Sequence, residues 1–319
     1  MILRSLYDSE RDPYTPIPMS PQNHREYCAG QVRTYDYDRY FAAAFAPAEV
    51  RRGLLALYAF NLEIASARER VSEALLGEIR LQWWRDAVSE IYDGSVRNHA
   101  VAAELASAIE TFALPKEPFD RMIDGRVFDM DEEAPEDINA FQNYVCATAG
   151  ELTCVAYRIC GVNGREDQAR LLGSVWGGTG LLRAVPFHLS QRRVYLPKDL
   201  LRRAGTTASM LADNGAGIDI SGAVGDLTEF LLGKLASVQK IEKGVRPAAS
   251  YIALATNYLK RLQACGNNVF SNRLEGARSA RLECAFLRSR PLMRCSNGGN
   301  RPKFTFMGWK VSLSAPPVM

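Results

Sequence analysis

The side chains best suited to chemistry in this sequence of 319 residues lie between Arg183 and Tyr195. Arg183, Arg192 and Arg193 could hold a phosphate or an anionic lipid headgroup, because guanidinium groups bind such oxygens through paired hydrogen bonds. The same arginines could equally belong to a solvated turn, with Arg183 paired to a core acid such as Glu69. The sequence leaves both interpretations open.

His188 lies in the same segment and could act as a metal ligand or as an acid. Neutral imidazole suits Zn²⁺ or Cu²⁺ better than Mg²⁺. Residues 181–197 contain no carboxylate and no cysteine that could complete a metal site. A packing or hydrogen-bonding role for His188 is therefore the favoured interpretation.

Three other segments resemble ligand or partner sites. The acidic run 129–137 could be a metal loop, but a solvated loop that caps the next helix is favoured. Residues 177–180 are rich in glycine yet lack the ending of a P-loop, so close helix packing is expected there. One of Trp83 and Trp84 should be buried and the other exposed or half-buried, because adjacent helical residues point about 100° apart, and an exposed tryptophan could anchor a partner.

The elements that must position these residues are helices. Apolar residues recur at three- and four-residue spacing, and convincing strand-type alternation is absent, so the predicted class is all-α. Pro135 and the acids after it mark a helix start. The main predicted helices cover residues 49–70, 76–92, 99–112, 135–160, 167–185, 227–243 and 248–263.

Composition indicates one large globular domain with two tails. Hydrophobic residues make up 47% of the chain, enough for a sizeable core, and the net charge of +3 is too small to indicate nucleic-acid binding. Residues 1–24 carry four prolines and no helical period, and predict a flexible tail. Residues 25–275 form the predicted helical domain, and 276–319 an irregular tail or a segment that replaces a last helix.

Cysteine usage and the N-terminal residues indicate the cellular compartment of the protein. Seven cysteines without a C-x-x-C pair indicate reduced, mostly buried thiols rather than disulfides or a zinc site. Asp8, Glu10 and Asp12 are unlike an acid-poor transit peptide, and no apolar run is long enough to span a membrane. A cytoplasmic protein is therefore expected.

The arginine- and histidine-containing segment resembles the second aspartate-rich helix of the squalene/phytoene synthase family. In active synthases that helix ends in a pattern like L-R-D-x-x-x-D, followed by a basic loop and Y-L-P. Here Leu182-Arg183 and Tyr195-Leu196-Pro197 match, but the two aspartate positions hold Ala184 and His188.

The first aspartate-rich helix is matched by residues 54–69, which resemble A-L-Y-A-F-C-R-x-x-D-D-x-x-D from Tyr58 onward. Its aspartate positions fall on Ala65, Ser66 and Glu69, so one carboxylate remains. Further similarity, at residues 37–52, 78–85, 119–129 and 143–150, extends the match from about residue 37 to about 271.

This resemblance implies an isoprenoid-synthase-type helical bundle with a central cavity. The active enzymes clamp the diphosphate of a prenyl substrate with Mg²⁺ held by carboxylates, because the leaving group's charge must be neutralised. With both clusters degraded, no catalytic residue, no metal and no cofactor is expected, and Mg²⁺ would be needed only in an enzyme.

The substituted motifs also resemble a non-catalytic branch, the mitochondrial complex I assembly factors of the phytoene-synthase type. That branch has an L-R-A-x-P-[YF]-H stretch, matched by residues 182–188, and a basic turn before V-[FY]-L-P, matched by 192–197. The resemblance implies an accessory or assembly factor for the respiratory NADH dehydrogenase. Its partners would be subunits or assembly proteins of that complex, with peripheral contact to the inner membrane, on the matrix side in a eukaryote.

Two other functions remain as alternatives. A head-to-head prenyl transferase, of the squalene or phytoene type, would need Glu69 together with Glu63, Asp129 or Glu151 to rebuild the metal site. A carrier could bind a prenyl or other lipid without chemistry. Candidate ligand- or anion-binding residues are Tyr58, Glu69, Arg183, His188, Arg192, Arg193 and Tyr195.

Overall fold

The computed structural model describes residues 21–71, 73–131, 133–238 and 241–274, and two short strands further on. Strands β1 (Thr305–Phe306) and β2 (Trp309–Lys310) pair in antiparallel fashion. The predicted tail 1–24 lies outside the described residues up to residue 20, and helix α1 already begins at Pro21. Apart from β1 and β2, the predicted tail 276–319 also lies outside them.

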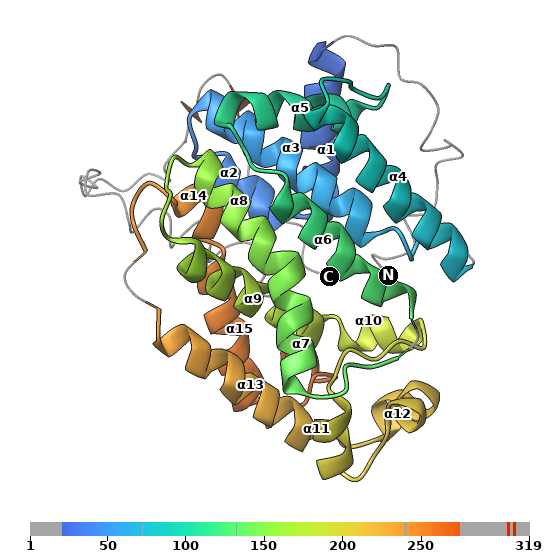
Figure 1. The fold of residues 1–319 in the computed structure, drawn as a ribbon. Coiled ribbons are helices and arrows are strands. Elements are labelled where there is room, and N and C mark those ends of the chain that lie inside the picture. Colours follow the sequence, from blue (N-terminus) through green and yellow to red (C-terminus); the bar gives the residue numbers. More distant parts are fainter. Residues whose placement is uncertain are drawn as a thin grey trace, which may run out of the picture.

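Helices build the described part of the chain, as the hydrophobic spacing predicts (Figure 1). The first half contains α1 (Pro21–Tyr35), α2 (Tyr37–Ala43), α3 (Ala48–Ala65), α4 (Ala74–Tyr92), α5 (Ala100–Phe112), α6 (Glu117–Val127) and the 3₁₀ turn η2 (Phe128–Met130). The second half contains α7 (Ile138–Val145), the π-helical segment η3 (Cys146–Gly150), α8 (Glu151–Ile159), α9 (Glu166–Arg183), α10 (Val185–Ser190), α11 (Lys198–Arg203), α12 (Ala208–Asn214), η4 (Gly215–Gly217), α13 (Ser221–Ala236), α14 (Arg246–Ala249), α15 (Ile252–Ala264) and η5 (Asn272–Leu274). None of the described helices is both long and apolar enough to cross a membrane.

Helix boundaries differ from the prediction where local capping or packing intervenes. The predicted helix 135–160 begins at Ile138, because the Asp137 side chain caps it by accepting from the backbone N–H groups of Asn139 and Ala140. A π-helical turn at Cys146–Gly150 then divides it into α7 and α8. Such a turn inserts one extra residue into a helix, so the side chains beyond it face in a different direction.

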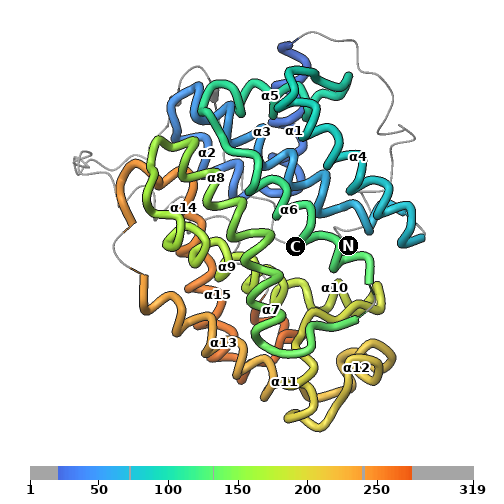
Figure 2. The backbone as a smooth tube through the Cα atoms, viewed as in Figure 1, coloured from blue at the N-terminus to red at the C-terminus, as the bar shows by residue number. Residues whose placement is uncertain are grey.

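Two buried apolar clusters meet at α9. One cluster joins α1, α3, α4, α5, α6 and α8, and the other joins α7, α11, α13 and α15. Trp176 of α9 packs against both clusters. Figure 2 shows α1 to α5 in the upper part of the view and α11 to α13 at the bottom, with α9 between them.

Glycines of α9 allow this helix to approach its neighbours closely. A Cβ atom at Gly173 would overlap the backbone oxygen of Ala149 in the π-helical segment. A Cβ at Gly178 would lie 2.8 Å from Leu231 Cδ2 of α13. The prediction that the small residues near 177–180 serve helix packing is thus confirmed for Gly178.

Candidate functional site

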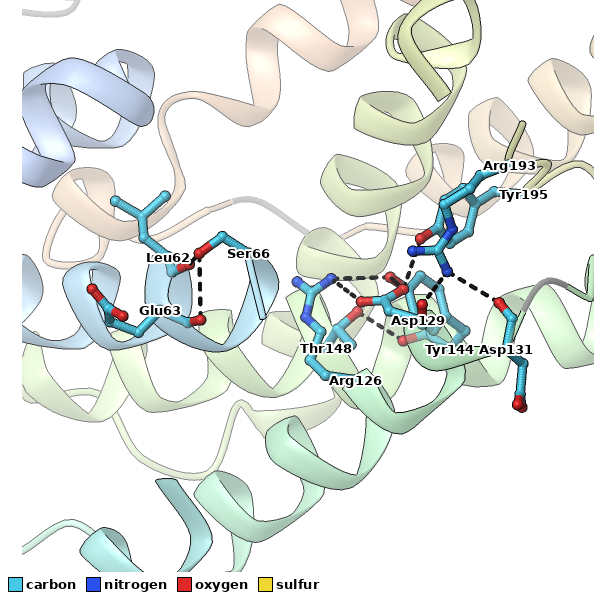
Figure 3. A network of polar contacts seen from close by, with 10 residues as sticks. All are labelled: Leu62, Glu63, Ser66, Arg126, Asp129, Asp131, Tyr144, Thr148, Arg193 and Tyr195. Atoms are coloured by element: carbon cyan, nitrogen blue, oxygen red, sulfur yellow. Dashed lines mark hydrogen bonds and ion pairs between the residues drawn. The ribbon is translucent and has the colours of Figure 1, made fainter. Parts of the chain in front are cut away.

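The two degraded motifs end at neighbouring helix termini. Ala65 is the last residue of α3, and Ser66 follows it with its hydroxyl donating to the carbonyl oxygen of Leu62 at 2.7 Å (Figure 3). Ala184 separates α9 from α10, and His188 lies on α10. The predicted helix 167–185 therefore stops at Arg183, where Pro186 forces a new helix to start.

A cavity of about 610 Å³ lies where these termini meet. Glu69 and Val71, after α3, line one wall, and Phe187 and His188 of α10 line another. Of the predicted ligand-binding residues, Glu69, His188, Arg192, Arg193 and Tyr195 line this cavity. Tyr58 and Arg183 are not among its lining residues.

A buried carboxylate lies next to this cavity. Asp129 is only 3% exposed, and its Oδ1 accepts hydrogen bonds from the hydroxyls of Tyr144 and Tyr195, both at 2.8 Å. Its Oδ2 accepts from Arg126 Nη1 at 3.2 Å (Figure 3). The interpretation of 129–137 as a solvated loop is therefore wrong for Asp129, although Asp131 and Glu133 are exposed.

Arginine side chains complete what we call the Asp129 network, formed by Arg126, Asp129, Tyr144, Arg193 and Tyr195. Arg126 Nη1 also donates to the Tyr144 hydroxyl at 2.9 Å. Arg193 donates to the backbone oxygens of Asp129 and Asp131 and lies over the Tyr195 ring, 5.4 Å from its centroid. Guanidinium groups thus bind the carboxylate and main-chain oxygens at the point where the two motifs converge.

Burial and nearby charges shift the pKa values around the network. Desolvation, followed by the Asp129 charge, raises the pKa of Glu69 and of both network tyrosines. Desolvation, reinforced by Arg193, lowers the pKa of His188 to about 4, and its imidazole is neutral at physiological pH. The His188 ring lies 4.7 Å from that of Tyr195 and packs against it, in keeping with the favoured interpretation.

The residues at the former aspartate positions do not fit Mg²⁺. Alanine supplies no ligand at Ala65 or Ala184, and the Ser66 hydroxyl is used within its own helix. Among the residues that the structure describes, no three histidine, cysteine or acidic side chains gather in an arrangement that could hold a metal ion. Hard cations such as Mg²⁺ need several oxygen ligands in near-octahedral geometry.

The carboxylates that could have rebuilt the metal site are engaged by arginines. Glu63 pairs with Arg70 at 3.1 Å and with Arg80 at 3.6 Å. Glu151 pairs with Arg170 at 2.7 Å and with Arg121 at 3.0 Å. Each acid is at most 4% exposed, so its arginines neutralise it inside the bundle.

The remaining predicted arginines have partners far along the chain. Arg183 pairs with Asp38 at 3.9 Å rather than with Glu69. Arg192 pairs with Asp213 of α12 at 2.6 Å, and its side chain is 71% exposed. Each arginine is therefore already paired with a carboxylate, and an incoming anion would have to compete with that carboxylate for it.

Tyr58 belongs to a second buried cluster, which we call the Arg39 cage. The Arg39 guanidinium carbon lies 5.5 Å from the ring centroid of Tyr58, 5.9 Å from that of Trp176 and 5.2 Å from that of Tyr251. Arg39 Nη1 donates to the Asp36 carboxylate at 2.5 Å. The cage is formed by Arg39, Tyr58, Trp176 and Tyr251.

The tryptophan pair divides as predicted. Trp84 is 3% exposed and packs edge-on against Phe60, with ring centroids 5.3 Å apart. Trp83 is half-buried, and its backbone oxygen accepts from Arg97, whose guanidinium lies over the Trp83 ring. Trp83 thus packs against Arg97 within the protein.

Sequence reasoning missed Arg126, Tyr144, Arg39 and Trp176, and it considered Asp129 only as a metal ligand or as part of a solvated loop. Asp129 and Tyr195 are 66 positions apart, and no local pattern relates them. The sequence did contain one usable signal, the spacing of Arg126 and Asp129. An arginine and an acid three residues apart at the end of a helix can form an ion pair, as these two residues do.

Comparisons with known proteins agree with the resemblances found in the sequence. A family model described as squalene/phytoene synthase matches residues 32–280. The chain is 30% identical over 264 residues to "NADH dehydrogenase (ubiquinone) complex I, assembly factor 6" of Mus musculus, covering 81% of this chain and 79% of the relative. The predicted similarity to the family and to its assembly-factor branch is confirmed.

Solved structures show the same fold. Squalene synthase HpnC from Alicyclobacillus acidocaldarius superimposes with a TM-score of 0.67 at 16% identity, over 81% of this chain and 99% of that one. A dehydrosqualene synthase in complex with ligand gives a TM-score of 0.64 at 18% identity, over 88% and 100%. The predicted isoprenoid-synthase-type bundle is confirmed.

Proposed function

This chain belongs to the squalene/phytoene synthase family, and we propose that it is a non-catalytic member that serves as an accessory or assembly factor for respiratory complex I. Complex I is the respiratory NADH dehydrogenase. The protein acts by binding, needs no metal or cofactor, and contacts subunits or other assembly proteins of that complex.

The observation that carries the proposal is the state of the former metal clamp. Ionisation of an allylic diphosphate needs cationic neutralisation of the leaving group, which carboxylate-bound Mg²⁺ supplies in the synthases. Here Ala65 and Ala184 offer no ligand, and the buried Asp129 is held by Arg126 and two tyrosines. The interior carboxylates stabilise the fold instead of holding metal.

The partner is inferred from the relatives rather than from the site. The Mus musculus relative named for assembly of NADH dehydrogenase (ubiquinone) complex I covers 81% of this chain, and its match includes the region of both degraded motifs. We extend that role to this protein. Such a role places it beside the membrane that holds complex I, at the cytoplasmic face in a bacterium or the matrix face in a mitochondrion.

Co-purification tests this function directly. The tagged chain, purified from its own cells under mild conditions, is expected to bring down identified subunits or assembly proteins of the NADH dehydrogenase. Cells that lack the protein should lose most of their assembled complex, measured by native gels and by NADH oxidation. Normal complex levels in those cells would overturn the proposal.

The enzyme alternative is tested by measuring diphosphate release from farnesyl and geranylgeranyl diphosphate, with Mg²⁺ or Mn²⁺ and with or without NADPH. No release above the uncatalysed background is expected. Turnover that disappears in Glu69→Ala would show that the metal site has been rebuilt and would refute the non-catalytic function. Extraction of bound lipid from the purified protein separately tests the carrier alternative.

A further inference from the structure

Helix α4 lies at the edge of the bundle and exposes a group of large aliphatic side chains in its first two turns (Figure 1). Leu75 is 62% exposed, Leu76 is 43% exposed and Ile79 is 56% exposed. Leu76 and Ile79 are three positions apart, so both lie on one side of the helix, and that side leads on to the half-buried Trp83. We call the surface formed by Leu75, Leu76 and Ile79 the α4 face.

The surroundings of the α4 face indicate what kind of group covers it. Large apolar side chains that gather at one place on a protein surface mark an interaction site. Glu73 and Glu78 flank them, both exposed, and neither side chain has a hydrogen bond or ion pair among the described residues. Two nearby arginines, Arg70 and Arg80, are both paired with Glu63 instead. The α4 face therefore favours an occupant that is apolar and carries positive charge.

The N-terminal segment, residues 1–20, joins the bundle beside this helix. Helix α1 is the first described element, and near its start Arg25 Nε lies 3.9 Å from Glu104 Oε1, near the start of α5. The start of α5 adjoins α4, because the ring of His99, the residue before α5, lies 5.3 Å from the ring of Trp83. The segment therefore begins close to the part of α4 that leads back to the α4 face.

The segment is long enough to cover the α4 face. Trp83 and Leu75 are eight positions apart in α4, which is about 12 Å at the helical rise of 1.5 Å per residue. Twenty extended residues span up to about 66 Å. The segment can therefore run along α4 as far as its first turn without being stretched.

The composition of the segment matches the α4 face. Five of its first seven residues are large and apolar, and Arg4 lies among them. Arg4 carries the charge that Glu73 and Glu78 lack as a partner. Residues 275–319 are basic as well, but they follow Leu274, which packs against the second apolar cluster, whereas α4 belongs to the first. Position and composition together favour the N-terminal segment.

We propose that residues 1–20 dock along α4, with the first seven residues on the α4 face and Arg4 beside Glu73 and Glu78. Because the segment is tethered to α1, its effective concentration at the α4 face is on the order of millimolar, so a few apolar contacts and one ion pair hold it there. Any other protein that uses the α4 face has to displace this segment. The inference does not depend on the proposed function.

Photocrosslinking in the full-length chain tests the contact. With p-benzoylphenylalanine at position 76 of dilute purified protein, we expect a product of monomer mass in which position 76 is joined to a peptide from residues 1–20. The matched control is the same probe at position 229, where an exposed residue of α13 belongs to a helix of the second cluster. Its crosslinks to residues 1–20 should be fewer by about fivefold or more.

The identity of the crosslinked peptide decides between occupants. Crosslinks from position 76 mainly to residues 275–319, or to a second copy in a product of dimer mass, would overturn the proposal. So would equal yields from positions 76 and 229, or no crosslink from position 76 to residues 1–20.

Substitution of the α4 face provides a second test in the full-length chain. Proteolysis of a docked segment follows the fraction of time that the segment is released, so Leu75→Asp combined with Ile79→Asp should speed trypsin cleavage after Arg4 and Arg11 by about tenfold. Met210→Asp, at an apolar residue of α12 that is 49% exposed, is the control and should leave cleavage unchanged. Thermal unfolding shows whether the variants fold, and unchanged cleavage in the folded double variant would refute the docking.

Discussion

The Asp129 network and the Arg39 cage are both buried and both charged, yet they are stabilised in different ways. Asp129 accepts hydrogen bonds from two tyrosine hydroxyls and one guanidinium group, so the charge is fully bonded. Arg39 has one carboxylate partner, Asp36, and is otherwise surrounded by aromatic rings. One cluster depends on directed hydrogen bonds, and the other on cation–π contact and packing.

The tyrosines make the difference plain. In the Asp129 network the hydroxyls of Tyr144 and Tyr195 both donate to a carboxylate. In the Arg39 cage the buried hydroxyls of Tyr58 and Tyr251 have no hydrogen-bond partner among the described residues. The same residue type thus contributes a polar bond in one region and mainly an aromatic face in the other, and substitutions should separate the two roles.

The largest effect is expected from Asp129→Ala. Removing this carboxylate leaves Arg126 and two phenols buried without their acceptor, which should lower the free energy of unfolding by about 3–5 kcal/mol. Urea denaturation followed by circular dichroism measures it. Asp131→Ala, at an exposed neighbour, is the control and should change stability by less than about 0.5 kcal/mol. Equal losses in the two variants would contradict the role of Asp129 as the centre of the network.

Arg39→Met should cost less, about 1–3 kcal/mol, because methionine still fills the space between the three rings. Asp36, which loses its ion-pair partner in this variant, has 13% of its side chain exposed and can be hydrated. The same denaturation experiment measures the loss, with the exposed Arg33→Met as the matched control. A loss larger than that of Asp129→Ala would mean that the cage, too, depends mainly on its ion pair.

His188 should make the Asp129 region sensitive to acid. Its pKa is lowered to about 4 in the folded protein, so the folded state takes up its proton less readily than the unfolded chain. The stability that His188 contributes is complete above about pH 6.5 and is lost as the pH falls towards 4, by about 1–3 kcal/mol.

The test compares unfolding free energies of the wild type and His188→Gln between pH 7.5 and 4.5. The raised pKa of Glu69 acts in the opposite direction in both proteins, so only the difference between them reports on His188. The wild type should lose more stability than the variant as the pH falls. Parallel pH profiles would show that the imidazole is hydrated rather than buried beside Tyr195.

The smallest effects test the comparison most directly. Tyr144→Phe and Tyr195→Phe each remove a hydrogen bond to a charged group and should cost about 1.5 kcal/mol. Tyr58→Phe and Tyr251→Phe remove hydroxyls that have no partner among the described residues, and should be neutral or slightly stabilising. Thermal unfolding of the four variants decides, and equal losses in all of them would erase the distinction between the two regions.

Much of the fold could be predicted because its signals are local. Helical spacing of apolar residues located α3, α4, α5 and α9, and the motif around Leu182 and Pro197 identified the family. The prediction was wrong where a neighbouring element changes the local geometry of a helix. An example is the π-helical turn Cys146–Gly150, which packs against α6 and α9. Close packing between helices of this kind leaves no periodic signal in the residues whose helical geometry it changes.

The sequence by itself determined the family, the helical class and the loss of the metal clamp, since each depends on residue types at fixed local spacing. Only the tertiary structure decided which acids are buried and which arginines bind them. Asp129 was expected in solvent, yet it is bonded to Tyr195 across 66 positions of chain. A buried charge must be satisfied by whatever donors the packed helices bring to it, and those donors are chosen by the fold rather than by their place in the sequence.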